Sequence, residues 1–335
     1  MLDVLYQSSS TYAVPAAVSI SSLLENNRDI NQIKVWFINV GMSQEDIKAL
    51  ELLVHSYGRE IEFIESTNID EYLVKIKVER WKGSYATFYK VFSCCALPMD
   101  RPILYIDADT LVLGSLKEFE EFDFEDNAVA MVSSAMTKRV KEFFNLKQYH
   151  NAGVIYFNTR YWKQNSIEDT IREEIKKENI TLVGDESLIN VALKGKIKKL
   201  PLKYNFESSW WLWGWNKRLY RKLGFENEPY YSPKEVKRIQ SNPIIAHYLD
   251  LTTGRPWDKY NDNIWSAEYK KYERKVRPWK KYDIPSNGIG ANRELFLIGK
   301  YCIKKIMPFY IRSVLGFKQH DKAWKKEITQ RSSDR

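Results

Sequence analysis

The chain has 335 residues, of which 44% are hydrophobic, so it can bury a substantial core, most simply as one domain with an appendage. Its three cysteines are too few for a disulfide framework, and its formal net charge of +9 suits an anionic partner. We expect a cytoplasmic protein, because no secretory leader and no apolar stretch of roughly 18 residues is visible.

Strand-like and helix-like segments alternate along the chain, as a layered α/β domain requires. Short runs rich in β-branched and aromatic residues predict strands at 3–6, 34–38, 61–64, 103–106, 127–132 and 153–157. Helices are predicted at 14–24, from Ser43 to near Gly58, at 85–97, at 167–178 and from Asp185 onward. Ser43 and Asp46 form the capping box of the second helix, and Pro98 closes the third.

The predicted strand 103–106 is followed by two aspartates, Asp107 and Asp109. In extended backbone their carboxylates share one face, where they repel each other unless a cation lies between them. Oxygen ligands of this kind suit Mg²⁺ or Mn²⁺, which also bind phosphate. A solvated loop after the strand is the alternative, and the two aspartates alone do not decide between these interpretations.

A second apolar run, Pro243 to Ala246, ends in His247. An imidazole and two carboxylates make a reasonable set of ligands for Mn²⁺, with positions left open for a diphosphate. Gly254 and Arg255 follow closely, and a flexible glycine beside a cation can cradle phosphate charge. Taken singly, His247 would be a capped or solvated histidine and Arg255 a surface cation.

Five motifs in this order resemble glycosyltransferase family 8, the retaining family of lipopolysaccharide galactosyltransferases, glucosyltransferases and glycogenin. They are Asp107-Ala-Asp109, Asn151-Ala-Gly153, Asp185-Glu-Ser-Leu-Ile-Asn190, Lys203-Tyr-Asn205 and His247…Gly254-Arg-Pro-Trp257. The resemblance implies a GT-A type, Rossmann-like α/β fold whose mixed, mainly parallel sheet is flanked by helices. It also implies a UDP-sugar donor and Mn²⁺, or alternatively Mg²⁺, bound by Asp107, Asp109 and His247.

The resemblance assigns further residues to the nucleotide sugar. They are Ser9, Tyr12, Lys90, Asp107, Ala108, Gly254 and Arg255. Ser9 or Ser10 stands where the family usually has an aspartate for uracil, and Tyr12 can stack on the base; an ordinary polar turn is the alternative. Lys90 occupies a position where the family more often has arginine, and an exposed helix lysine is an equally good interpretation.

Asn151, Asp185 and Glu186 are the candidate catalytic residues. Asn151 can bind sugar hydroxyls, while Gly153 permits a close approach of the backbone; a turn is the alternative. In the family, the pair matching Asp185 and Glu186 touches the transferred sugar, although an acidic helix N-terminus is the simpler interpretation. We favour front-face attack, in which the leaving diphosphate oxygen accepts the acceptor's proton, over Glu186 as a nucleophile.

Two other classes of function compete with the transferase. A sugar-nucleotide nucleotidyltransferase usually has a glycine-rich basic loop after the first strand, and residues 7–12 contain neither Gly nor Lys. A non-catalytic basic protein that binds membrane or nucleic acid leaves the carboxylates unexplained. The favoured function is therefore metal-dependent transfer of galactose or glucose to a glycan, with no nucleic-acid partner. The tryptophans from Trp210 to Trp215 are either an acceptor platform or packing beneath a loop.

Residues 266–335 are expected to form a basic, aromatic helical extension of a catalytic domain at 1–265. From Arg293 to Lys318, apolar residues are interleaved with Lys and Arg. Such a segment suits the surface of an anionic bilayer, where each cation adds about 1 kcal/mol, or it is a packing helix with a solvated basic face. The membrane interpretation gives a peripheral protein on the cytoplasmic face and a lipid-linked acceptor, such as a lipopolysaccharide precursor or another cell-surface polysaccharide.

Deleting the segment after Arg293 is expected to release the protein from anionic vesicles, because most of the interleaved cations are removed. Activity toward a small soluble acceptor should remain. Vesicle co-sedimentation measures the first effect, and an unchanged membrane partition would refute the anchor.

Overall fold

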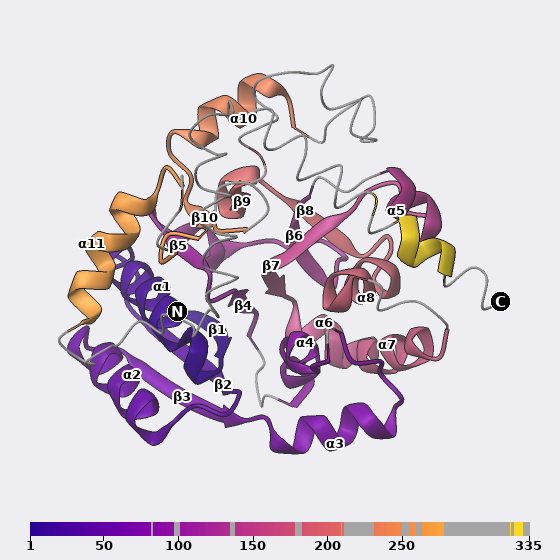
Figure 1. Ribbon diagram of the computed structural model, residues 1–335, viewed down its shortest axis with the longest axis horizontal. Helices are drawn as coiled ribbons and strands as arrows, with labels where there is room; N and C mark the ends of the chain where they lie inside the picture. Colours follow the sequence, from indigo (N-terminus) through magenta and orange to yellow (C-terminus); the bar gives the residue numbers. More distant parts are fainter. Residues whose placement is uncertain are drawn as a thin grey trace, which may run out of the picture.

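The computed structural model describes residues 1–81, 83–96, 101–134, 138–177, 183–208, 210, 231–249, 255–258, 261, 263–277, 322 and 325–330. In this part of the chain, helices cover both faces of a seven-stranded sheet, and a smaller three-stranded sheet lies beside it (Figure 1). The arrangement is that of a layered α/β domain.

The large sheet has the strand order β3-β2-β1-β4-β7-β6-β8. Its strands are β1 (Leu2–Ser8), β2 (Ile33–Asn39), β3 (Glu60–Glu65), β4 (Ile103–Ile106), β6 (Val129–Ser133), β7 (His150–Phe157) and β8 (Ile197–Leu200). Strands β3, β2, β1 and β4 are parallel, β7 is antiparallel to both β4 and β6, and β8 is parallel to β6. The sheet is therefore mixed and mainly parallel, as expected.

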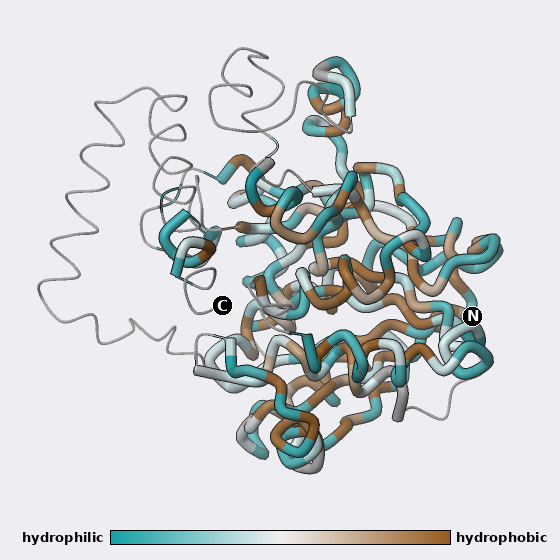
Figure 2. The backbone as a smooth tube through the Cα atoms, turned by 90° about the vertical axis from the view of Figure 1, so that its right-hand side faces the viewer, coloured by the Kyte–Doolittle hydropathy of each residue, from teal (hydrophilic) through white to brown (hydrophobic). Residues whose placement is uncertain are grey.

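Each face of the sheet has its own core, because successive strand residues point to opposite sides. Val4 and Tyr6 join one core, and Leu5 between them joins the other. The first core is covered by α1 (Ala13–Asn26), α2 (Gln44–Ser56), α10 (Pro233–Gln240) and α11 (Ser266–Val276). The second is covered by α3 (Thr67–Lys75), α4 (Ala86–Ala96), α6 (Thr159–Gln164), α7 (Ile167–Ile175) and α8 (Gly184–Ala192). Burial on both faces explains the continuous apolar strands, which Figure 2 shows inside a hydrophilic shell.

The small sheet has the order β5-β10-β9, with β5 at Thr110–Val112, β9 at Phe206–Glu207 and β10 at Ile245–His247. Strand β10 is antiparallel to β5, which places His247 opposite Thr110. It is parallel to β9, which places His247 opposite Glu207. Three distant parts of the chain therefore meet at His247.

The predicted strands and helices are present, with differences at their ends. Strand β7 begins at His150, so Asn151 lies inside the strand and not before it. The segment from Asp107 to Asp109 is a turn between β4 and β5, not the extended backbone that we expected. Helix α2 has the predicted cap, since the Ser43 side chain accepts a hydrogen bond from the Asp46 amide. Several elements were not predicted. They are the helices α3, α5 (Lys138–Phe143), α6 and α10, the strands β5, β8 and β9, and the 3-10 helices η1 (Ser10–Tyr12), η2 (Lys117–Glu121) and η3 (Leu202–Tyr204).

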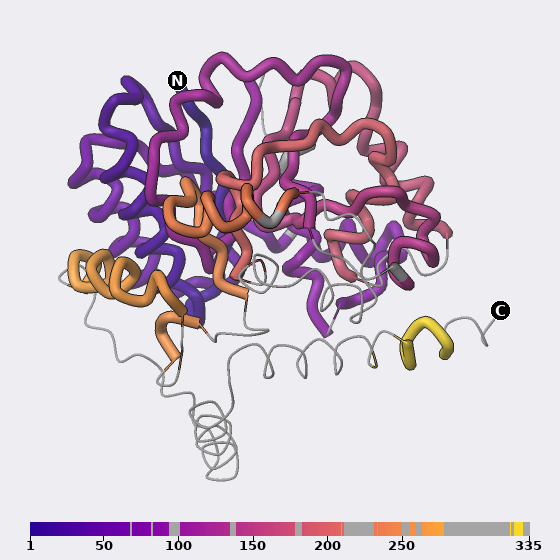
Figure 3. Tube along the Cα trace, turned by 90° about the horizontal axis from the view of Figure 1, so that it is seen from above, coloured from indigo at the N-terminus to yellow at the C-terminus, as the bar shows by residue number. Residues whose placement is uncertain are grey.

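Helix α11, the start of the expected extension, packs against α1 (Figure 3). Its Tyr269, Tyr272 and Val276 are buried in the first core. The segment from Arg293 to Lys318, on which the membrane prediction rests, lies outside the described residues. No helix in the described part of the chain is both long enough and apolar enough to cross a membrane.

Candidate active site

The candidate residues gather at one edge of the large sheet. Strands β1 and β4 are parallel neighbours, so the loops that follow them, with Tyr12 and Asp107, leave the sheet at the same edge. The antiparallel strand β7 enters the sheet at this edge with His150 and Asn151, and the backbone amide of Asp107 donates to the Gly153 carbonyl at 2.8 Å. Ligands of open α/β sheets bind outside the carboxyl ends of the strands, and this is such a position.

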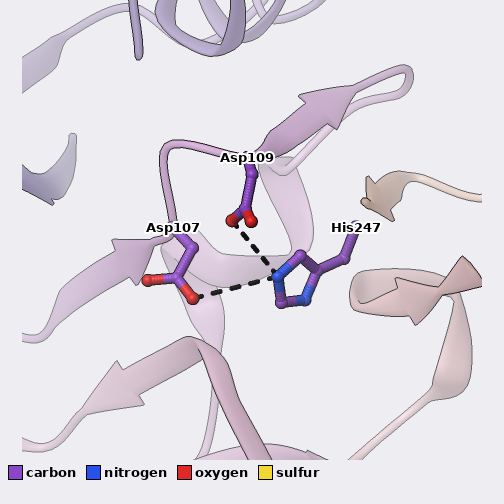
Figure 4. Close-up of side chains that lie close together, drawn as sticks. All are labelled: Asp107, Asp109 and His247. Carbon is purple, nitrogen blue, oxygen red and sulfur yellow. Dashed lines mark ion pairs between the residues drawn. The ribbon is translucent and has the colours of Figure 1, made fainter. Parts of the chain in front are cut away.

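Asp107, Asp109 and His247 converge as predicted (Figure 4). His247 Nε2 lies 3.4 Å from Asp109 Oδ1 and 3.9 Å from Asp107 Oδ2. The imidazole is buried, whereas both carboxylates are partly exposed. The turn after β4 supplies the aspartates, and the end of β10 supplies the histidine.

The geometry of these three groups fits a divalent ion. Two atoms that each lie about 2.1 Å from one metal ion can be at most ~4.2 Å apart, and both distances from His247 Nε2 to the carboxylates are below this limit. The imidazole and the Asp109 carboxylate also shift each other's pKa. Burial lowers the pKa of His247, but the neighbouring Asp109 and Asp107 carboxylates outweigh it, so the net shift is upward. Burial raises the pKa of Asp109, and His247 and Arg255 reverse that shift to a net decrease.

Lys90 is a buried cation between two candidate site carboxylates, which rules out an exposed helix lysine. Its side chain is 5% exposed, and Nζ lies 2.7 Å from Asp185 Oδ2 and 3.4 Å from Asp107 Oδ1. Nζ also donates to the Ala152 carbonyl at 3.0 Å. Burial lowers the pKa of Lys90, but the carboxylates of Asp107 and Asp185 raise it by more than burial lowers it. The net shift is upward, so the lysine stays charged.

Asp185 and Glu186 lie in the first turn of α8, as expected. Asp185 is buried and accepts hydrogen bonds from Thr87 and Lys90, yet burial outweighs these contacts and raises its pKa. Glu186 Oε2 accepts from Asn151 Nδ2 at 2.9 Å and from the Ala152 amide at 3.2 Å. Burial, and then the nearby Glu207 and Asp185 carboxylates, raise the pKa of Glu186 well above its ordinary value.

Asn151 lies in the network between Glu186 and His247. Its Oδ1 accepts from the Gly153 amide at 2.8 Å and from Asn205 Nδ2 at 2.8 Å. Asn205 Oδ1 lies 3.0 Å from His247 Nδ1. Gly153 is required here for space, since a Cβ at this position would lie 2.2 Å from His247 Cε1.

The candidate donor residues form a second group around Arg255. Its guanidinium lies over the rings of Tyr12, at 5.2 Å, and Trp257, at 5.6 Å, and it contacts the Tyr12 hydroxyl. Arg255 Nη2 lies 3.4 Å from Asp109 Oδ2, so this group adjoins the aspartates. Ala108 is buried in the turn between the aspartates, and Gly254 lies outside the described residues.

The serines of the first loop are held by neighbouring polar groups. Ser9 Oγ shares a hydrogen bond with the Thr11 hydroxyl at 2.8 Å. Ser10 Oγ donates to Asp46 Oδ2 at 2.7 Å and accepts from the Ser43 amide at 2.9 Å. Ser10 therefore ties the loop to the start of α2, whereas the Ser9 side chain bonds within the loop.

Three residues of the site were not predicted. Tyr105 is buried and its hydroxyl donates to Asp107 Oδ1; strand alternation places residues 105 and 107 on one side, so the signal was present in the sequence. Glu207 lies opposite His247 in the small sheet, and Asn205 contacts the His247 ring. Asn205 belongs to the motif Lys203-Tyr-Asn205, which marked this residue without giving it a role. No local pattern signals Glu207, because its position beside His247 depends on the pairing of β9 with β10.

Trp210 begins the tryptophan cluster, and its ring is fully buried 5.5 Å from that of Tyr231. Trp210 is therefore part of the hydrophobic core and does not belong to an exposed acceptor platform. Residues 211–215 lie outside the described part of the chain.

Two curated proteins illustrate what the chain is similar to. It is 25% identical over 258 residues to glycosyltransferase GlyF of Streptococcus pneumoniae, covering 75% of this chain and 56% of GlyF. It is 28% identical over 284 residues to a lipopolysaccharide 1,2-glucosyltransferase of Escherichia coli, covering 80% of this chain and 76% of that protein. The chain thus spans only about half the length of GlyF.

The solved structure of galactosyltransferase LgtC with donor and acceptor sugar analogs matches with a TM-score of 0.68 at 17% identity, covering 82% of this chain and 96% of LgtC. GlyE of Streptococcus pneumoniae matches with a TM-score of 0.58 at 18% identity, covering 82% of this chain and 61% of GlyE. Both are GT-A fold glycosyltransferases, which confirms the expected fold. The model of glycosyl transferase family 8 matches residues 3–261, so this chain belongs to that family of glycosyltransferases.

Proposed function

We propose that this protein is a metal-dependent, retaining hexosyltransferase that moves galactose or glucose from a UDP-sugar to a glycan. The observation that carries the proposal is the convergence of Asp107, Asp109 and His247 beside the buried Lys90. Membership of family 8 supports the reaction class.

The charges of the site support an anionic donor bound through a cation. The described residues bring five carboxyl groups toward two permanently charged basic side chains, Lys90 and Arg255. The acidic members are Asp107, Asp109, Asp185, Glu186 and Glu207. A diphosphate would be repelled from this edge unless a divalent ion bound first. Mn²⁺ or Mg²⁺ held by Asp107, Asp109 and His247 would stabilise negative charge on the leaving diphosphate.

The remaining residues have roles that follow from their positions. Arg255 and Tyr12 form a cationic and aromatic surface beside Asp109, suited to the phosphates and base of the donor. Ser9 and Ala108 complete that side, and Gly254 is proposed from the sequence. On the other side, Lys90 holds Asp185 next to the place for the sugar, and α8 presents Glu186.

Front-face attack is the mechanism that the surroundings of Glu186 support. Burial, Glu207 and Asp185 raise the pKa of Glu186 well above its ordinary value, which disfavours the carboxylate form that a nucleophile requires. Its Oε2 is also engaged by Asn151 and the Ala152 amide. We therefore expect Glu186→Gln to keep turnover within about tenfold of the wild type. A complete loss with intact donor binding would favour the covalent route.

The test of the function is donor hydrolysis by the purified protein. With Mn²⁺ present, we expect slow release of UDP from UDP-galactose or UDP-glucose, stopped by a chelator and by Asp109→Asn. ADP-, GDP- and CDP-sugars serve as controls for the base. If the folded protein takes up neither Mn²⁺ nor any nucleotide sugar, the proposal fails.

The acceptor is proposed from the relatives and the basic C-terminal sequence. A lipopolysaccharide 1,2-glucosyltransferase is among the relatives, which supports a lipopolysaccharide precursor or similar lipid-linked glycan. The interleaved cations after Arg293 support a peripheral position on the cytoplasmic face of an anionic membrane. The vesicle experiment with the truncated chain tests this part separately.

A further inference from the structure

A continuous network of buried amide contacts connects the backbone of β7 to the imidazole of His247. Asn205 is fully buried, and Asn151 is 7% and His247 2% exposed. The contacts run from the Gly153 amide to Asn151, from Asn151 to Asn205 and from Asn205 to the imidazole ring, with distances of 2.8, 2.8 and 3.0 Å.

In this network, backbone amides determine which atom of each hydrogen bond donates and which accepts. The Gly153 amide can only donate, so the atom of Asn151 that faces it is the oxygen. The nitrogen of Asn151 then faces Glu186 Oε2, which already accepts from the Ala152 amide. Both ends of the Asn151 amide are therefore determined.

The orientation of Asn151 determines that of the next two groups. Because Asn151 Oδ1 is an acceptor, Asn205 must present its nitrogen to it. The oxygen of Asn205 consequently faces His247 Nδ1, and that ring nitrogen must carry hydrogen to complete the bond. In a neutral imidazole the other nitrogen, Nε2, then has a free lone pair, and it is Nε2 that lies next to Asp107 and Asp109.

Asp109 favours the other tautomer of His247, so the contact with Asn205 is needed to keep hydrogen on Nδ1. The carboxylate of Asp109 lies 3.4 Å from Nε2, which favours hydrogen on Nε2 and would block a metal there. The acceptor oxygen of Asn205 favours hydrogen on Nδ1 instead. Partners on the second ring nitrogen of a metal-binding histidine fix its tautomer, and their loss typically lowers metal affinity roughly 10- to 100-fold.

We propose that Asn205 is a positioning residue that holds His247 in its Nδ1–H form, so that Nε2 is available to bind a divalent metal ion. Asn151 orients Asn205 and also the carboxyl group of Glu186, so one amide serves both the metal side and the sugar side of the site. This inference rests on the proposed metal-dependent function, but the tautomer itself exists without metal.

The experiment is long-range ¹H–¹⁵N correlation spectroscopy of the metal-free protein, recorded at alkaline pH where the imidazole is neutral. The signals of His247 are assigned by their absence from His247→Gln. We expect the Nδ1–H tautomer in the wild type and a shift to Nε2–H in Asn205→Leu, whose side chain has similar size and no acceptor. Mn²⁺ titration should show roughly 10- to 100-fold weaker binding by Asn205→Leu.

Two further variants separate positioning from stability. Asn205→Asp keeps an acceptor for Nδ1–H but faces Asn151 Oδ1 with a second oxygen, so it should melt at a lower temperature and still keep the Nδ1–H tautomer. Asn27→Leu removes another fully buried asparagine, one that bonds the Leu23 carbonyl and the Leu116 amide, and it should lose stability without changing the His247 tautomer.

The wild-type spectrum decides the matter even if Asn205→Leu does not fold. An Nε2–H tautomer in the metal-free wild type overturns the proposal, as does an Asn205→Leu variant that keeps both Nδ1–H and full Mn²⁺ affinity. If the wild type shows Nδ1–H but neither binds Mn²⁺ nor hydrolyses a UDP-sugar, the proposed function fails while the tautomer assignment stands.

Discussion

Replacing Gly153 with alanine is expected to weaken Mn²⁺ binding by roughly 100-fold or more and to remove transferase activity. The added Cβ would lie 2.2 Å from His247 Cε1 and 2.7 Å from Nδ1, so the ring must move. The ring cannot move without breaking its contact with Asn205 and leaving the aspartates. Overpacking of this kind also costs about 1–3 kcal/mol of stability. Mn²⁺ titration and UDP release measure the two functional effects.

Gly58→Ala is the matched control for the added methyl group. Gly58 has a φ of +67° and nothing within 4 Å of a Cβ, so alanine there costs about 1 kcal/mol through backbone strain alone. Its Mn²⁺ affinity should equal that of the wild type. Normal metal binding by Gly153→Ala would show that His247 is not a ligand in this position.

Replacing Lys90 with methionine is expected to reduce transfer roughly 100- to 1,000-fold and to destabilise the fold by about 3–5 kcal/mol. The Lys90 and Asp185 side chains are 5% and 8% exposed, and their charged atoms lie 2.7 Å apart. Methionine would leave the buried carboxylate of Asp185 without its cation and would increase the repulsion between Asp185 and Asp107. Urea denaturation and steady-state rates measure the two effects.

The stability loss in Lys90→Met should grow with pH. Burial already raises the pKa of Asp185 against the opposing effect of Lys90, and removal of the lysine raises it further. Above the ordinary aspartate pKa the folded protein then binds more protons than the unfolded chain, so its stability falls as pH rises. The stability difference between Lys90→Met and the wild type should therefore be smallest in mild acid, where Asp185 is protonated.

Two variants provide the controls for Lys90. Lys34→Met removes a lysine paired with the half-exposed Glu62 at 2.6 Å, and it should cost at most about 1 kcal/mol and leave activity intact. The double variant Lys90→Met, Asp185→Asn removes both buried charges and should regain much of the stability but none of the activity. Full activity of Lys90→Met would contradict a role for this lysine in the site.

The layered α/β fold and the positions of the candidate metal ligands along the chain could be predicted from the pattern of amino acids. The run Ile103 to Ile106 is continuously apolar, as a strand covered on both faces requires, and polar Asp107 marks its end. Alternation of strands and helices then required a mainly parallel sheet, whose loops meet at one edge. The order of five motifs indicated the family that residues 3–261 match.

Tertiary structure decided which of these residues touch, and how. Lys90 could equally have been an exposed helix lysine until α4 and α8 were placed on one face of the sheet. Glu207 and Asn205 reach His247 only because the two-residue strand β9 pairs with β10 in one register. Gly153 proved necessary because the ring of His247 lies against it. Local periodicity tells which side of a strand is buried, but the choice of a distant partner and its register is made by the whole chain.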